Sequence, residues 1–241
     1  MPVLAKMGKV EKWRYRASIF PSLAGLALLL GLSLGYHSPT LPLQSDISSL
    51  VFITICIVGA IAGQFPSKIR GLTKKAPQKE EVGSGYLGHH PSCGQFDTHV
   101  LKFRQKILCA GCTGLSIGAA AAVIVTLYVL INPIKTSSLI TLIVGVALAA
   151  IGILQHALGR EPRIHLALNV ILVLGVALAR IGANQLNGGI VVDAYTLAIS
   201  MYLIVARIDL SRNDHQAICS SCEEPCEISY SAKHKLSIID D

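Results

Sequence analysis

The chain has 241 residues, of which 52% are hydrophobic and only 15% are charged, and its mean hydropathy is +0.57. These values are typical of an integral membrane protein and argue against a water-soluble domain or a disordered chain. The formal net charge is +7, but most basic residues fall in loops on one side of the predicted membrane helices, so the charge does not require a nucleic acid partner.

Six stretches are apolar over the length that crosses a bilayer. About 20 residues are needed, because the hydrocarbon offers no partner to a bare backbone group. The first stretch shows no clear small-residue cleavage site, so we expect it to stay as a helix and not to be a signal peptide. The sequence therefore predicts an all-α, multi-pass protein with six transmembrane helices at 18–36, 47–65, 111–132, 138–159, 164–186 and 189–207.

The basic residues predict the orientation of these helices. Nineteen of the 21 Lys and Arg residues lie on one side, Lys135 lies in a loop on the other, and Arg180 lies within a helix. Because Lys and Arg accumulate in cytoplasmic loops, both termini are predicted to be cytoplasmic, in a protein of the cell membrane. The predicted parts are a basic N-terminus (1–17), two helices (18–66), a basic Cys/His loop (67–110), four helices (111–207) and a Cys-containing tail (208–241).

Cysteines and histidines gather at the end of that loop, in the stretch HHPSCGQFDTHVLKFRQKILCAGCTG. Thiols on the cytoplasmic side stay reduced, which favours a metal site or a catalytic dithiol over a disulfide framework. Cys109 and Cys112 form a CxxC pair. We expect Cys93 and His90 to supply the other two ligands of a tetrahedral zinc ion, with His99 as the alternative to His90.

The tail repeats the pattern in HQAICSSCEEPC, which could bind a second zinc ion or complete the first site. An iron–sulfur cluster is less favoured, because neither group has four cysteines nearby. A tail that binds no metal is the remaining alternative. The candidate ligands of the tail are His215, Cys219, Cys222 and Cys226.

The start of the third helix adds a second interpretation of the CxxC pair. Free backbone N–H groups there favour a thiolate, which assists metal binding and thiol redox chemistry alike. A dithiol oxidoreductase of the thioredoxin kind would sit on a βαβ pattern, which the sequence does not show. Cys56, within the second helix, is expected to be a packing residue.

The string LCAGCTGLSIG, preceded by HHPSCGQF, resembles an uncharacterised family of bacterial and archaeal polytopic membrane proteins. The pattern of that family runs approximately CHQxPxRSF, CxRCTG and QxxGxREsxN. Gly111 stands where the family has Arg, and Pro162 stands where it has Ser. The resemblance covers about residues 89–175 and implies a multi-pass topology and a cysteine site, but no particular reaction. The matching positions are Cys109, Cys112, Thr113 and Gly114, then 93–96 more loosely, and in part Gln155, Gly159, Arg160 and Glu161.

The turn QHALGREPRIH, after the fourth helix, lies on the same predicted face as the CxxC pair. Polar side chains at membrane depth are costly unless they serve a purpose, so this turn supplies candidate catalytic residues. A solvated turn with positive charge inside is the alternative. We expect the turn and the CxxC pair to form one cytoplasmic pocket. The candidates are His156, Arg160, Glu161 and His165.

Arg180 lies in the outer part of the fifth predicted helix. It could pair with Asp193, but we favour the interpretation that it snorkels outward beside Asn184 and Gln185. Small residues four apart in three helices predict close helix packing, either within the bundle or in a homo-oligomer. These pairs are Gly118 with Ala122, Gly145 with Ala149 and Gly175 with Ala179.

The sequence thus predicts an integral membrane protein with a zinc site on its cytoplasmic face, in a binding or regulatory role. The alternative is a metal-dependent or thiol-dependent membrane enzyme that acts on a lipid-soluble substrate, so whether the protein is an enzyme stays open. A metal transporter is less favoured, because the helices carry few acidic or histidine residues near mid-membrane. The expected partners are the lipid bilayer and either a second copy or another membrane protein.

Overall fold

The computed structural model describes residues 9–35, 42–64, 86–87, 96, 99–103, 106–132, 137–155, 161–187 and 189–220. The helices in this part of the chain are α2 (Lys9–Gly35), α3 (Pro42–Gln64), α5 (Ala110–Ile131), α6 (Ser138–Ile153), α8 (Pro162–Asn187) and α9 (Ile190–Ser220). The strands are β1 (Tyr86–Leu87), β2 (Val100–Phe103) and β3 (Lys106–Cys109).

Four of these helices are long and apolar enough to cross a membrane: α2, α5, α8 and α9. The apolar parts of α3 and α6 are shorter, at Ser45–Ile61 and Ser138–Ile153. Large apolar side chains such as Phe20, Ile124 and Ile131 point outward with most of their surface exposed, as a lipid-facing surface requires. The chain is therefore a multi-pass integral membrane protein, and its helices lie where the apolar stretches predicted them.

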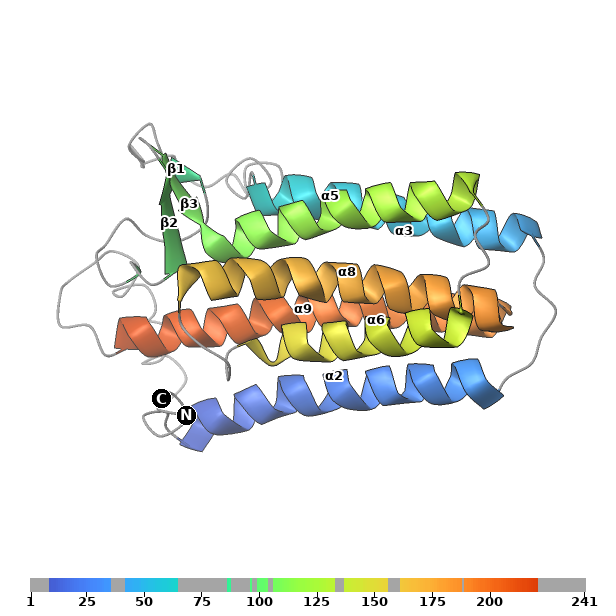
Figure 1. The fold of residues 1–241 in the computed structure, drawn as a ribbon. Helices are drawn as coiled ribbons and strands as arrows, with labels where there is room; N and C mark the ends of the chain where they lie inside the picture. The colour runs from blue at the N-terminus through green and yellow to red at the C-terminus, as the bar shows by residue number, and fades with distance from the viewer. Residues whose placement is uncertain are drawn as a thin grey trace, which may run out of the picture.

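The helices alternate in direction along the bundle, so that α2 begins and α9 ends at the same end (Figure 1). The strands stand at this end, which we call the sheet end. Helix α8 forms the centre, since it contacts α2, α5, α6 and α9, and 67% of its span is buried inside the bundle. Residues at the start of α8 are therefore enclosed by the other helices.

Small residues bring α6 and α8 together in an antiparallel pair. A Cβ added at Gly152 would lie 2.6 Å from the Leu172 Cβ, and one added at Gly175 would meet the Gly145 carbonyl oxygen at 2.8 Å. Gly118 of α5 contacts Val170 of α8 in the same close manner. The glycine and alanine pairs in the sequence thus serve packing within the bundle, where small residues allow backbones to approach.

Several helix bounds and one element differ from the sequence prediction. Helices α2 and α3 begin at Lys9 and Pro42 where starts at 18 and 47 were expected, and α6 ends at Ile153 where 159 was expected. Helix α9 continues to Ser220, whereas the last helix was expected to end at 207. A three-stranded sheet of order β1-β3-β2 occupies part of the predicted loop at 67–110. Strands β2 and β3 are antiparallel, with Val100 opposite Cys109, and β3 leads directly into α5. The β2–β3 hairpin therefore positions Cys109, which is the last residue of β3 and the first cysteine of the CxxC pair.

Candidate functional site

A group of polar side chains lies buried or half-buried at the sheet end, where α5 and α8 begin and α6 and α9 end. Membrane helices seldom bury such groups without a partner or a purpose. We call this group the sheet-end cluster. Its members are His99, Cys109, Cys112, Gln155, His165, Asn169, Arg207, Asp214 and His215.

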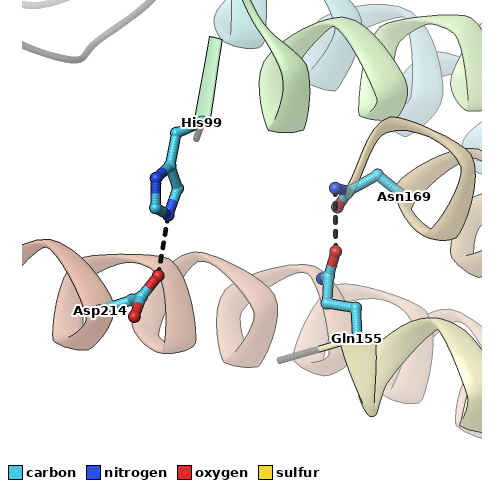
Figure 2. A network of polar contacts seen from close by, with 4 residues as sticks. All are labelled: His99, Gln155, Asn169 and Asp214. Carbon is cyan, nitrogen blue, oxygen red and sulfur yellow. Dashed lines mark hydrogen bonds and ion pairs between the residues drawn. The ribbon is translucent and has the colours of Figure 1, made fainter. Parts of the chain in front are cut away.

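Asn169 of α8 joins three elements of the cluster. It is fully buried, and its Nδ2 donates to the Gln155 Oε1 at 3.0 Å and to the His165 carbonyl oxygen at 2.6 Å. Its Oδ1 accepts a hydrogen bond of 2.8 Å from the Nε of Arg207 on α9. Figure 2 shows the contact of Asn169 with Gln155, which follows the end of α6. One amide therefore ties α6, α8 and α9 together.

Cys109 and Cys112 lie side by side at the start of α5. Cys109 is the N-cap residue in extended conformation and is buried, and its side chain lies close enough to that of Cys112 for the two to interact. The guanidinium of Arg207 is near both thiols. A Cβ at Gly111 would lie 3.2 Å from the Arg207 Nη2. The absence of a side chain at Gly111 thus leaves room for this guanidinium beside the thiols.

The other aromatic rings of the cluster pack around His99. The Nε2 of His99 lies within hydrogen-bond distance, 2.9 Å, of the Asp214 Oδ2 (Figure 2). The His99 ring stacks on that of His165, with centroids 5.6 Å apart, and meets His215 edge-on at 5.8 Å. Phe96 contacts both His99 and His215. The segment before β2 is thereby held against α8 and α9.

The first turns of α5 and α8 touch, as expected. A Cβ at Gly114 would lie 2.5 Å from the Leu166 carbonyl oxygen and 2.9 Å from the Asn169 Cβ. His165, which is buried, lies near enough to Cys109 for the two to interact electrostatically. Glu161 is instead exposed, and its carbonyl oxygen accepts the backbone N–H of His165. Of these two candidate catalytic residues, only His165 belongs to the cluster.

The structure brings His215 to the same cluster as Cys109 and Cys112. The other candidate ligands, His90, Cys93, Cys222 and Cys226, lie outside the described residues, as do His156 and Arg160. Cys219 falls in the last turn of α9, but its side chain is not described. Within the described residues, no group of three or more His, Cys, Asp or Glu side chains could hold a metal ion. The described residues thus contribute two adjacent thiols to a candidate metal site, those of Cys109 and Cys112.

Sequence reasoning missed the part played by Arg207. It was counted only among the basic residues of the predicted cytoplasmic side, at the last position of the predicted helix 189–207, yet it is 4% exposed and contacts Asn169 inside the bundle. The signal available in the sequence was its position directly after the apolar run of the last helix. Asp214, five residues short of Cys219, was also missed, because the tail was not expected to be helical there.

The preferred interpretation of Arg180, that it snorkels outward, is wrong. Its side chain is buried, and its Nη2 donates to the Ser48 Oγ at 2.6 Å and the Ser49 Oγ at 3.1 Å. The guanidinium carbon also lies 5.4 Å from the centre of the Phe52 ring. These partners on α3 make burial favourable, because both serine hydroxyls donate to the Ser45 carbonyl oxygen and leave their oxygens free to accept.

No family model, curated protein or solved structure matches the chain.

Proposed function

We propose that the protein binds a zinc ion at its sheet end and that the ion holds the 67–110 loop against the helix bundle, in a binding or regulatory role. The observation that carries this proposal is the contact between the Cys109 and Cys112 side chains. Two thiolates from one CxxC turn can fill two of the four positions around tetrahedral zinc. Zinc would supply a crosslink that a short polar loop cannot make by itself.

Cys93 and His90 are the proposed remaining ligands. The pairing of Val100 with Cys109 brings the segment before β2 next to the CxxC pair. Cys93 precedes Val100 by seven positions, and an extended chain advances about 3.3 Å per residue. The loop is thus long enough to return to the thiols. His215 and Cys219, carried by the end of α9, are alternative ligands from the tail.

Arg207 supports the proposal through its charge. A site with three thiolates and one histidine around zinc carries a negative charge, which a nearby guanidinium offsets. In the resembling family an arginine directly precedes the second cysteine of the CxxC pair, whereas this chain has Gly111 at that position and places Arg207 beside that glycine. We infer that Arg207 replaces the charge of the family's arginine.

Zinc content of the purified protein tests the proposal. Cys109→Ser and Cys112→Ser should each lose most of the bound zinc, because structural zinc sites in small peptides contribute roughly 10–16 kcal/mol. Cys56→Ser is the matched control, since Cys56 is buried in α3 away from the sheet end and should keep full zinc. Full zinc in the Cys109→Ser, Cys112→Ser double variant would exclude this site.

The proposal includes six membrane-spanning helices with both termini in the cytoplasm. The distribution of Lys and Arg supports it, and the start of α2 and the end of α9 lie at the same end of the bundle (Figure 1). Labelling of single cysteines introduced at both ends of the chain and at position 135 tests it. Protection of the two ends and labelling of position 135 from outside are expected; the opposite pattern would invert the orientation.

A thiol-dependent enzyme is the second candidate, and the placement of Arg207 beside both thiols favours it. A guanidinium next to a cysteine offers a counter-charge to the reactive thiolate. The same protein sample separates the two candidates. Wild-type protein that contains no zinc, and whose Cys109 and Cys112 form a disulfide with a mild oxidant, would support thiol chemistry over metal binding.

A further inference from the structure

A hollow lies on the side of the bundle, between the first turns of α2 and the last turns of α9. Its volume is about 410 Å³, within the range of roughly 300–1,000 Å³ that small-molecule sites occupy. It shares no lining residue with the sheet-end cluster. Its walls are Trp13 and Ala17 of α2 and, from α9, Tyr202, Val205, Asp209 and Arg212.

The lining changes character along α9. Tyr202 and Val205 form the deeper part, and Asp209 and Arg212 form the part near the helix end. Ten residues separate Tyr202 from Arg212, which is about 15 Å of helix rise. The hollow therefore runs from apolar surface to charged surface over about half the thickness of the hydrocarbon core, that is, from within one leaflet to its surface.

Trp13 lies just before the apolar span of α2, which begins at Tyr15, and is 69% exposed. Amphipathic rings of this kind settle at the headgroup level of the membrane. The exposed ring of Tyr202 lines the same hollow at a greater depth. Both helices that form the hollow are long and apolar enough to span the membrane, and Val205 in its lining is 52% exposed. The surroundings of the hollow are thus lipid.

The charge around the mouth favours an anionic ligand. Arg212 is 71% exposed, and its Nη1 lies 4.0 Å from the Asp209 Oδ1, a weak pair that leaves the guanidinium able to bind a phosphate. The first turns of α2 carry four basic residues against one acidic residue, Glu11. These basic residues are Lys9, Lys12, Arg14 and Arg16.

We propose that this hollow is a binding site for one anionic phospholipid of the leaflet at the sheet end. The phosphate binds Arg212, and the upper acyl chain lies along Ala17 and Val205. Electrostatic attraction at an anionic leaflet is short-ranged and adds with each basic side chain. The hollow adds shape to this attraction, so the lipid is held at one place.

Trp13 gives a direct measurement, because it is the only tryptophan of the chain. The full-length protein is placed in nanodiscs of unlabelled zwitterionic lipid that contain the same low fraction of either brominated phosphatidylglycerol or brominated phosphatidylcholine. Bromine quenches a neighbouring indole. We expect the phosphatidylglycerol to quench Trp13 at about one fifth of the concentration that phosphatidylcholine requires, the factor that one basic side chain contributes.

Two variants identify the source of the preference. Arg212→Gln should make the two lipids nearly equal, and it should fold, because the side chain is exposed. Ala17→Leu leaves every charge in place but fills the hollow, so it should also remove the preference. Arg163→Gln, at the exposed start of α8, is the matched control and should keep it.

Three results would overturn the proposal. Equal quenching by the two lipids in the wild type would remove the anionic preference. An equal effect of Arg163→Gln and Arg212→Gln would reduce it to diffuse surface charge. A full preference in Ala17→Leu would show that the hollow does not contain the lipid.

Discussion

Replacing Asn169 with alanine is the sharpest test of the sheet-end cluster. The change removes the amide that joins α8 to Gln155 and to Arg207, and it leaves the buried guanidinium without its Nε partner. Hydrogen bonds between membrane helices contribute about 0.6–1.7 kcal/mol, and bonds to charged groups about 1.5–3 kcal/mol. Together these two bonds predict that Asn169→Ala lowers the free energy of unfolding by about 2–5 kcal/mol.

Asn132→Ala is the matched control for this change. Asn132 also donates from its Nδ2, to the Tyr128 carbonyl oxygen at 3.2 Å, but it is exposed at the end of α5. Its replacement should change stability by less than about 0.5 kcal/mol. Unfolding in mixed detergent micelles, followed by circular dichroism, gives both values in one experiment.

A second substitution tests the cause. Because Asn169→Ala strands a buried charge, adding Arg207→Met should restore part of the lost stability. The reasoning would be refuted if Asn169→Ala cost no more than Asn132→Ala, or if Arg207→Met cost as much in the Asn169→Ala background as in the wild type.

Three further predictions use the same unfolding measurement. Gly145→Leu should lower the free energy of unfolding by at least about 1–3 kcal/mol, because a Cβ at this position meets the backbone of Ala179. Gly59→Leu should be near neutral, because a Cβ at Gly59 has no atom within 4 Å. Equal losses in the two variants would contradict the close packing of α6 against α8. Asp214→Ala should cost about 1–3 kcal/mol, because it removes the contact with His99. Asp209→Ala should cost less than about 0.5 kcal/mol, because its pair with Arg212 is exposed. A larger loss in Asp209→Ala than in Asp214→Ala would argue against the contact between His99 and Asp214. Ser48→Ala with Ser49→Ala should destabilise more than Arg180→Met, because the serine changes leave a charge buried and the arginine change removes it; a larger loss in Arg180→Met would disprove this.

The helices could be predicted from the sequence because the bilayer imposes one rule on all of them. An apolar run such as 111–132 has to be helical in lipid, and α5 spans Ala110–Ile131. The end of α9 could not be predicted in this way. Asp209, Arg212 and Asp214 mark where the apolar run stops, but a helix can continue into water once the membrane no longer dictates its composition.

Part of the candidate site was predictable and part was not. His165 was visible as a polar residue at the start of an apolar helix, and its closeness to Cys109 followed from the predicted topology. The partners of Arg180 were not visible, because Ser48 lies 132 residues away and nothing in either segment specifies the other. Strands as short as β2 and β3, at four residues each, show too few periods to be recognised.

The length of α6 has a consequence for the membrane around the protein. Its 16 residues rise about 24 Å, while the hydrocarbon of a typical bilayer is about 30 Å thick. Helix α8, packed along it, has 26 residues and exceeds that thickness. If α6 spans the bilayer, as proposed above, the mismatch is accommodated by local thinning of the bilayer or by flanking side chains that reach the interface, at a cost of fractions of a kcal/mol for each ångström. Gln155, which follows the end of α6, accepts a hydrogen bond from Asn169, so a mismatch at this end of α6 bears on that hydrogen bond. Thinner membranes reduce the mismatch and accommodate the protein at a lower free-energy cost.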